Sequence, residues 1–211
     1  EFLDYPVVSG NVSFYNGTNH KSISPTPVIG GVGLINKLCK PIGLNFKKEK
    51  SVILLVGRTF GHIEQSCFLK ENYSIIDGAP PDVNLSNEKN NGENVLKLIQ
   101  DNLVLSSHDI SSGGLIVALS EMAISSNYGV KIHKPKRLTN LNRYFFGEDQ
   151  GRYILEVDST NLLKIEKTLK NNNIYYENIG FTQKEHFEID GELKINIKDL
   201  FEVNNQWYNN Y

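Results

Sequence analysis

The alternation of apolar and polar residues becomes regular after about residue 50. Val52–Val56 is a short, wholly apolar run that ends at Gly57, a pattern typical of a strand covered on both faces. Val104–Leu105 and Tyr153–Val157 predict two further strands, the first of them brief. The chain therefore carries strands that need helices packed on both sides.

Helical spacing of apolar residues falls between these strands. A stripe with this spacing predicts a helix over about Asn94–Asn102, and a second begins at Leu115, with Gly129 as its expected end. A third helix is predicted from Leu162 to Leu169. The apolar positions that carry the three predictions are Leu96, Ile99 and Leu103; Leu115, Ala118, Leu119, Met122 and Ala123; and Leu162, Ile165 and Leu169.

The last third adds a strand over Ile174–Ile179 and a hairpin. Phe187–Ile189 and Leu193–Ile195 alternate apolar with polar residues across Asp190-Gly191, a strong short-range signal for a hairpin. The tail from Glu202 to Tyr211 carries no usable pattern and is expected to be frayed. Together these elements predict an α/β (α+β) fold, a mixed sheet with packed helices.

The first 45 residues have a different character and are expected to be a partial domain, so we expect domains at 1–45 and 46–211. Strands are predicted at Pro6–Val8 and near Val28–Leu34, with a short helix possible near Phe14–Asn16. The basic stretch 47–50 is expected to be a solvated linker or turn. Because the chain enters an apolar segment at once, without a starting Met, we expect it to be a fragment.

Composition places the chain among globular proteins and excludes several classes. Of 211 residues, 39% are hydrophobic and 22% charged, and the formal net charge is −2, so nothing favours nucleic acid or an anionic membrane as partner. The longest apolar runs are far too short to span a bilayer, and a cytoplasmic location is the default expectation. Cys39 and Cys67 are too few for a disulfide framework and are expected to be reduced packing residues.

Small and polar residues concentrate at Ser9-Gly10-Asn11 and Ser13. Gly10 has no Cβ and would let a ligand approach the backbone, while Asn11 and Ser13 offer oxygen atoms suited to a hard cation or a phosphate. The alternative is a plain turn, because these residue types are the commonest turn formers. Local chemistry alone leaves both open and favours the turn.

A second cluster is HDISSGG, His108 to Gly114, between a predicted strand and a predicted helix. Gly113 and Gly114 would place free N–H groups at a helix N-terminus, where anions are stabilised. Alternatively this is a tight turn in which Asp109 or Ser111 caps the helix. His108 could be a base or a ligand, but a single His without a visible partner set is more often structural.

The third cluster is FGEDQGR, Phe146 to Arg152. Glu148, Asp149 and Gln150 could accept from hydroxyls or hold a cation, with Arg152 available for phosphate. A polar turn before the next strand is the alternative. The stretch Asp77–Asp82 is predicted to be a loop without chemistry.

Four segments in this order and spacing carry a family resemblance: SGNVSFYN, PTPVIGGVGLI, HDISSGGLIVALSEMA and FGEDQGR. They resemble the C-terminal part of phosphoribosylformylglycinamidine synthase, in the synthetase subunit of its small, multi-subunit type, over Pro6 to about Ile189. That family is a tandem duplication of the fold of aminoimidazole ribonucleotide synthetase. The resemblance implies that the chain is the end of the second ATP-binding N-domain followed by the whole second C-domain.

The resemblance also implies chemistry. The family uses ATP and glutamine-derived ammonia to convert formylglycinamide ribonucleotide into formylglycinamidine ribonucleotide, with Mg²⁺ at the phosphates. By the family pattern Gly10 contacts ATP, Asn11 coordinates Mg²⁺ and Ser13 contacts the substrate. The catalytic residues would belong to the other half of the synthetase. Implied partners are that missing N-terminal half, a glutaminase subunit and a small accessory subunit.

By the pseudo-symmetry of the duplicated family, a second, auxiliary nucleotide pocket is implied. The residues expected to line it are His108, Asp109, Gly113, Gly114, Glu148, Asp149 and Gln150. Two positions depart from the family pattern: Gly17 stands where Glu is frequent, and Ser112 replaces an Asp. They leave a metal role for the loop from His108 to Gly114 without support.

Two other functions stay open. One is a non-catalytic α/β docking module for glutaminase subunits. The other is a different ATP-dependent enzyme of the same superfamily, such as a selenophosphate synthetase, a thiamine-phosphate kinase or a hydrogenase-maturation protein, which the segment SGNVSFYN disfavours.

Overall fold

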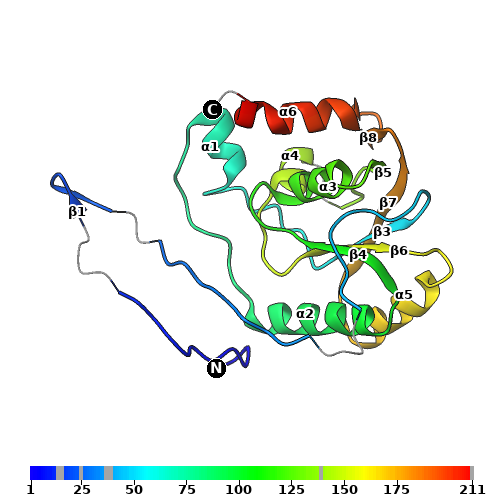
Figure 1. The fold of residues 1–211 in the computed structure, drawn as a ribbon, viewed down its shortest axis with the longest axis horizontal. Coiled ribbons are helices and arrows are strands. Elements are labelled where there is room, and N and C mark those ends of the chain that lie inside the picture. Colours follow the sequence, from blue (N-terminus) through cyan, green and yellow to red (C-terminus); the bar gives the residue numbers. More distant parts are fainter. Residues whose placement is uncertain (13–16, 24–25, 36–39, 138–139, 210–211) are drawn as a thin grey trace. The chain divides into compact units, whose positions relative to one another are not determined.

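The computed structural model describes residues 1–12, 17–23, 26–35, 40–137 and 140–209. The chain forms two compact units, Glu1–Leu38 and Cys39–Tyr211 (Figure 1).

The N-terminal unit contains one small antiparallel hairpin, β1 (Gly17–Thr18) and β2 (Lys21–Ser22). Asn19 and His20 in its turn both have positive φ, at 52° and 62°, as a tight hairpin turn requires. The strands predicted at Pro6–Val8 and in the described part of Val28–Leu34 are wrong, since both stretches lack regular structure. A strand needs a neighbour to pair with, and among the described residues these stretches have none. The helix expected near Phe14–Asn16 lies outside the described residues.

The C-terminal unit is built on a seven-stranded mixed sheet with the strand order β4-β6-β3-β7-β5-β8-β9. All neighbours run antiparallel except β5 and β8, which are parallel. The strands are β3 (Val52–Val56), β4 (Val104–Asp109), β5 (Tyr128–Ile132), β6 (Tyr153–Val157), β7 (Tyr176–Lys184), β8 (His186–Ile189) and β9 (Leu193–Asn196).

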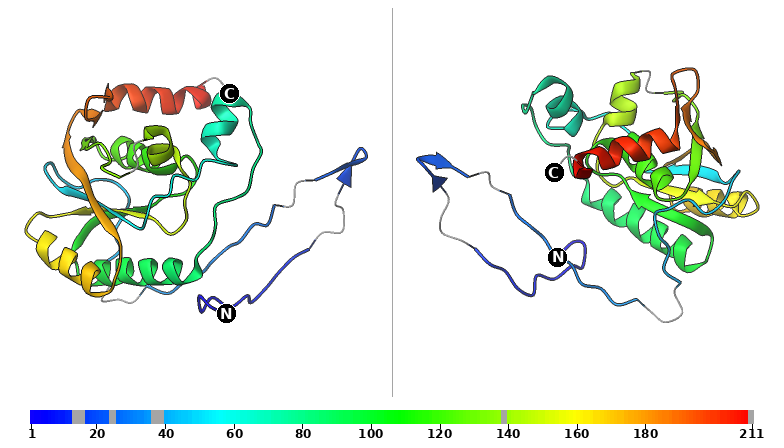
Figure 2. Two further views of the ribbon diagram at one scale, coloured as in Figure 1. Left: turned by 180° about the vertical axis from the view of Figure 1, so that it is seen from behind. Right: turned by 45° about the horizontal axis from the view of Figure 1, so that its top comes forward.

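Helices cover both faces of this sheet (Figures 1 and 2). One face packs against α3, α4 and α6, and the other against α2 and α5. The helices are α1 (Cys67–Tyr73), α2 (Leu85–Gln100), α3 (Gly114–Ile124), α4 (Leu141–Phe146), α5 (Leu162–Asn171) and α6 (Ile197–Asn209). The expected fold class, a mixed sheet with packed helices, is confirmed.

Strand β3 explains the layering. Ile53 and Leu55 belong to the apolar cluster on one face, and Leu54 and Val56 to the cluster on the other, and all four are fully buried. Alternate residues of a strand point to opposite faces, so a wholly apolar strand requires cover on both sides. The prediction from Val52–Val56 is therefore confirmed, as is the β8–β9 hairpin across Asp190-Gly191.

Three elements differ from expectation. Gly129 does not end a helix but lies in β5, where an added Cβ would collide with the carbonyl oxygen of His186 in the parallel neighbour β8. The expected frayed tail from Glu202 is helical as far as Asn209, where it forms the end of α6, and Leu200 earlier in this helix packs against the core. Helix α2 begins at Leu85, well before the predicted Asn94, because Asn84 caps it by accepting from the N–H of Asn87 at 2.9 Å.

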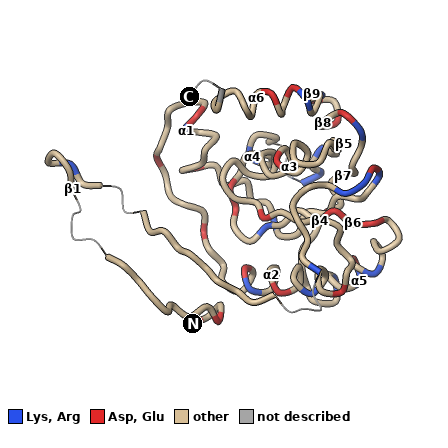
Figure 3. The backbone as a smooth tube through the Cα atoms, viewed as in Figure 1, with Lys and Arg blue, Asp and Glu red and all other residues tan. Residues whose placement is uncertain are grey.

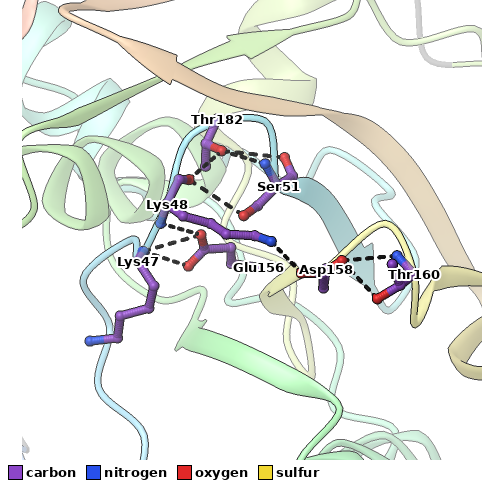
Figure 4. A network of polar contacts seen from close by, with 7 residues as sticks. All are labelled: Lys47, Lys48, Ser51, Glu156, Asp158, Thr160 and Thr182. Carbon is purple, nitrogen blue, oxygen red and sulfur yellow. Dashed lines mark hydrogen bonds and ion pairs between the residues drawn. The ribbon is translucent and has the colours of Figure 1, made fainter.

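The segment that leads into β3 is attached to the sheet by a buried carboxylate (Figure 4). Glu156 of β6 is fully buried and accepts from the backbone N–H groups of Lys47 and Lys48, at 2.9 and 3.2 Å for its closest oxygens. The oxygen that accepts from Lys47 at 2.9 Å also accepts from the Ser106 hydroxyl at 2.7 Å. The stretch predicted as a solvated linker is thus anchored through its backbone.

Lysine and arginine are interspersed with aspartate and glutamate over the C-terminal unit (Figure 3). This mixture fits the near-neutral net charge of −2. None of the helices in the described ranges is long and apolar enough to cross a membrane.

Candidate functional site

The polar turn FGEDQGR is the centre of a junction between three segments. It follows α4 and leads into β6, and it contacts the start of α3 and the loop that leaves β3 at Gly57. Two of its acidic side chains hold these neighbours in place.

Glu148 connects the N-termini of two helices. One of its oxygens accepts from the N–H of Gly113 at 2.8 Å and from the N–H of Cys67 at 2.8 Å. Gly113 is the N-cap of α3, and Cys67 is the first residue of α1. A carboxylate is stabilised there by the unpaired N–H groups and by the helix dipole. The anion that the Gly-Gly helix start was expected to attract is, at Gly113, a side chain of this same protein.

The alternative prediction, that Asp109 or Ser111 caps α3, is wrong, since no side chain of the preceding loop accepts from the helix start. Gly114 is required there for packing. It has φ +72°, and an added Cβ would lie 2.7 Å from the carbonyl oxygen of Gly147 and 2.8 Å from that of Phe145. The start of α3 therefore lies directly against the end of α4.

Asp149 organises the loop after β3. It is 4% exposed, and its two oxygens accept from three consecutive N–H groups, those of Phe60, Gly61 and His62, at 2.9 to 3.1 Å. Successive backbone N–H groups that converge in this way form an anion-binding concavity. Here too the anion in the concavity is a side chain of the protein itself, the Asp149 carboxylate.

Arg152 completes the junction and is 1% exposed. Its guanidinium donates to the carbonyl oxygens of Gly147 at 2.6 Å and Asp149 at 3.1 Å, and to the Thr59 hydroxyl at 3.1 Å. Burial lowers the pKa of this guanidinium, and the nearby Asp149 carboxylate opposes that shift. The prediction that Arg152 is available for a phosphate is wrong, because its donors are engaged inside the protein.

Gln150 is the member of the motif that faces solvent and pockets. It lines a pocket of about 300 Å³ and an adjoining one of about 440 Å³, which share Phe60 and Asn87 as well. The larger pocket is lined by several residues that carry side-chain amides, Asn87, Asn90, Asn91, Gln150 and Asn173, and of these Asn91 donates to the carbonyl oxygen of Gly151 at 2.9 Å. Asn87, Asn90 and Asn91 are spaced to lie on one face of α2, and this spacing is a sequence signal for the surface that the sequence prediction did not use.

Glu88 borders the smaller pocket together with Asp82. Burial raises the pKa of the Glu88 carboxyl above its ordinary value. The site thus combines neutral amides with a carboxyl group that holds its proton more readily than usual.

His108 and Asp109 lie at the end of the edge strand β4. The His108 ring contacts the Asp109 carboxylate at 3.2 Å through Nδ1 and the Glu121 carboxylate at 3.0 Å through Nε2. Of the residues expected to line the auxiliary nucleotide pocket, Gly113 and Glu148 are joined by a hydrogen bond, while His108 contacts Glu121 of α3.

Gly10 and Asn11 belong to the N-terminal unit and are exposed, and Ser13 lies outside the described residues. An added Cβ at Gly10 would meet nothing within 4 Å. In the described ranges there is no group of three or more His, Cys, Asp or Glu side chains placed to hold a metal ion. Cys67 is a free, exposed thiol, so its expected packing role is wrong.

The C-terminal unit matches a known domain family. Residues 48–191, more than half of the chain, match the family model described as AIR synthase related protein, C-terminal domain, and the chain belongs to this family. Over 210 residues it is 43% identical to the phosphoribosylformylglycinamidine synthase subunit PurL of Pelagibacter ubique (strain HTCC1062), covering 100% of this chain and 29% of that protein.

Solved structures show the same fold at low sequence identity. PurL of T. maritima complexed with FGAR has a TM-score of 0.61 at 17% identity, covering 76% of this chain and 29% of that chain. The same protein complexed with ATP gives a TM-score of 0.59 at 15% identity, covering 76% and 27%. The chain therefore spans less than a third of the length of these PurL proteins.

Proposed function

We propose that this chain is the C-terminal portion of the synthetase subunit of a phosphoribosylformylglycinamidine synthase, acting in purine biosynthesis. The observation that carries the proposal is the 43% identity to a PurL subunit across the whole chain, from the SGN segment to the C-terminal unit. ATP phosphorylates the amide oxygen of formylglycinamide ribonucleotide, releasing ADP. Ammonia then adds to the carbon atom that carries this phosphorylated oxygen, and phosphate leaves as the amidine forms.

Three residues of the N-terminal unit would contribute one wall of the ATP site. Gly10, open on all sides where a Cβ would stand, allows the nucleotide to lie against the backbone, and Ser13 would contact the substrate. Asn11 offers one neutral oxygen to Mg²⁺, which would neutralise charge on the transferred phosphate. The carboxylate ligands of the Mg²⁺ ion would come from another part of the synthetase subunit. The ATP and FGAR complexes of T. maritima PurL support these ligand classes.

The N-terminal unit also supports a larger assembly. Val8, Val28 and Val32 are 92%, 94% and 97% exposed in this unit, and apolar surface of this kind marks an interface. We assign its cover to the rest of the synthetase subunit. A glutaminase subunit and a small accessory subunit would supply ammonia, and the cytoplasm is the location that this role implies.

The auxiliary nucleotide pocket stays part of the proposal, with its roles divided by the geometry. Gln150 would contact the ligand from the wall that it shares with the α2 asparagines. Glu148 and Asp149 would act by holding the helix start and the loop around it, because their oxygens accept from the chain's own N–H groups. Gly113 and Gly114 would support this arrangement, and His108 and Asp109 would border it.

The test compares variants of the protein in its full natural length, with ammonia and then glutamine as nitrogen donor. Asn11→Ala should lower the ammonia-dependent rate by tenfold or more and raise the Mg²⁺ requirement. Asn204→Ala, at an exposed position of α6, is the matched control and should retain activity. A docking module predicts the opposite pattern: ammonia-driven synthesis survives deletion of residues 46–211 while glutamine use is lost.

A further inference from the structure

Two arginines from different loops gather around one tyrosine ring. Arg58 follows β3, and its guanidinium carbon lies 4.6 Å from the centre of the Tyr175 ring. Arg137, from the segment after β5, lies 5.7 Å from the same ring. Stacking on an aromatic face orients a guanidinium and leaves its N–H edge free for a ligand.

The ring itself is fixed. The Tyr175 hydroxyl donates to one oxygen of Glu177 at 2.6 Å, and the Tyr144 hydroxyl donates to the other at 3.3 Å. Both oxygens of the nearby carboxylate are thereby engaged by hydroxyl groups. Among the residues that the structure describes, no carboxylate lies within ion-pair distance of Arg58 or Arg137, so two cations face one satisfied carboxylate.

These groups enclose a pocket of about 130 Å³, lined by Arg58, Arg137, Tyr144, Tyr175 and Glu177 among others. It adjoins the amide-lined pocket of about 440 Å³, with which it shares Arg58, Phe60 and Tyr175. A small cationic pocket therefore opens beside a larger one rich in neutral donors and acceptors. A phosphorylated sugar or nucleoside is complementary to this pair of pockets, because it joins an anionic phosphate to a part with neutral donors and acceptors.

We propose that this double pocket binds a phosphate monoester of a nucleoside or sugar, with its phosphate between Arg58 and Arg137. Guanidinium groups bind phosphate oxygens through paired, charge-assisted hydrogen bonds. The amides of Asn87, Asn90 and Asn173 then meet hydroxyl groups or a base edge, because each amide offers both a donor and an acceptor. This inference rests on the proposed function, because the amide-lined pocket is the one assigned there to the auxiliary nucleotide, and it adds the two arginines that would hold the phosphate.

The test is calorimetric titration of the protein in its full natural length, at low ionic strength, with AMP, ribose 5-phosphate, inorganic phosphate and adenosine. AMP is expected to bind, and Arg58→Gln or Arg137→Gln should weaken it about tenfold or more, the loss expected for one charged hydrogen-bonding group. Arg58→Lys, which keeps the charge but not the paired geometry, should give an intermediate loss. Lys170→Gln is the control, because it removes one charge from the last turn of α5 and lines neither pocket.

Each outcome bears on the proposal. Equal affinity of wild-type protein and both arginine variants for AMP, or no AMP binding at millimolar concentration, would overturn it. Adenosine that binds as tightly as AMP would remove the phosphate role, and inorganic phosphate that binds as tightly as AMP would remove the amide pocket. Unfolding temperatures equal to wild type confirm that the variants are folded, as expected for two exposed side chains.

Discussion

Glu148 and Gly113 lie 35 residues apart in the chain and are joined by one hydrogen bond, in which a carboxylate oxygen accepts from the N–H of the α3 N-cap at 2.8 Å. The same oxygen accepts from Cys67 at the start of α1. A single acidic side chain therefore accepts hydrogen bonds from the N-termini of two helices. The FGEDQGR turn thus has a structural role, because it holds parts of the C-terminal unit together.

This relationship predicts the effect of removing the carboxylate. Glu148→Ala leaves two helix N–H groups without their acceptor and should lower the free energy of unfolding by about 1–3 kcal/mol. Urea unfolding followed by circular dichroism measures it. Glu148→Gln should lose less, because an amide oxygen can still accept. The control Glu71→Ala removes an exposed glutamate on α1 and should change stability by no more than about 0.5 kcal/mol; a loss equal to that of Glu148→Ala would contradict the assigned role.

Alanine substitutions at Gly10 and Gly114 should change different properties, ATP binding at Gly10 and stability at Gly114. Gly114→Ala introduces a Cβ at φ +72°, within 3 Å of two carbonyl oxygens, and should destabilise the protein by more than 1 kcal/mol. Gly10→Ala meets no atom within 4 Å and should leave the unfolding temperature unchanged. If Gly10 lines the ATP site as proposed, its alanine variant should instead raise the KM for ATP. Thermal scans and steady-state kinetics on the same two variants distinguish the roles.

The extent to which the sequence predicts this structure follows from the range of each interaction. Val52–Val56 and the Asp190-Gly191 hairpin were predictable because a strand's apolar pattern and a hairpin turn are local properties. Strand β5 and helix α6 were missed because their stability depends on distant neighbours, such as the close approach of β8 at Gly129. Glycines at a helix start predict an anion, but no local pattern could show that Glu148 supplies it. The Arg58 pocket was missed for the same reason.

Acid stability should depend on Asp158. Hydrogen bonds from the Lys48 ammonium, followed by those from Thr160, hold the pKa of the Asp158 carboxyl well below its usual range (Figure 4). A carboxyl whose pKa is lowered by folding contributes stability above its unfolded pKa of about 4, and this stability is lost as the pH falls toward the folded value. Asp158→Asn should therefore lower the unfolding temperature at pH 7 and have little effect near pH 2. Equal losses at both pH values would show that the carboxylate charge is not the cause.

The 211 residues alone should be inactive as a synthase, although the C-terminal unit should fold. That unit has its own sheet, helices on both faces and two apolar clusters, which are the requirements of a stable domain. The proposed ATP site, in contrast, receives only Gly10, Asn11 and Ser13 from this chain, and the nucleotide needs further ligands for its phosphates and Mg²⁺. Purified chain supplied with formylglycinamide ribonucleotide, Mg²⁺-ATP and ammonia should release no ADP above background, while circular dichroism shows a cooperative unfolding transition. Adding the remaining part of the synthetase as a separate polypeptide should restore turnover if the two pieces reassemble. Turnover by the 211 residues alone would mean that the catalytic groups lie within this sequence. It would contradict the proposal that this chain supplies only one wall of the ATP site.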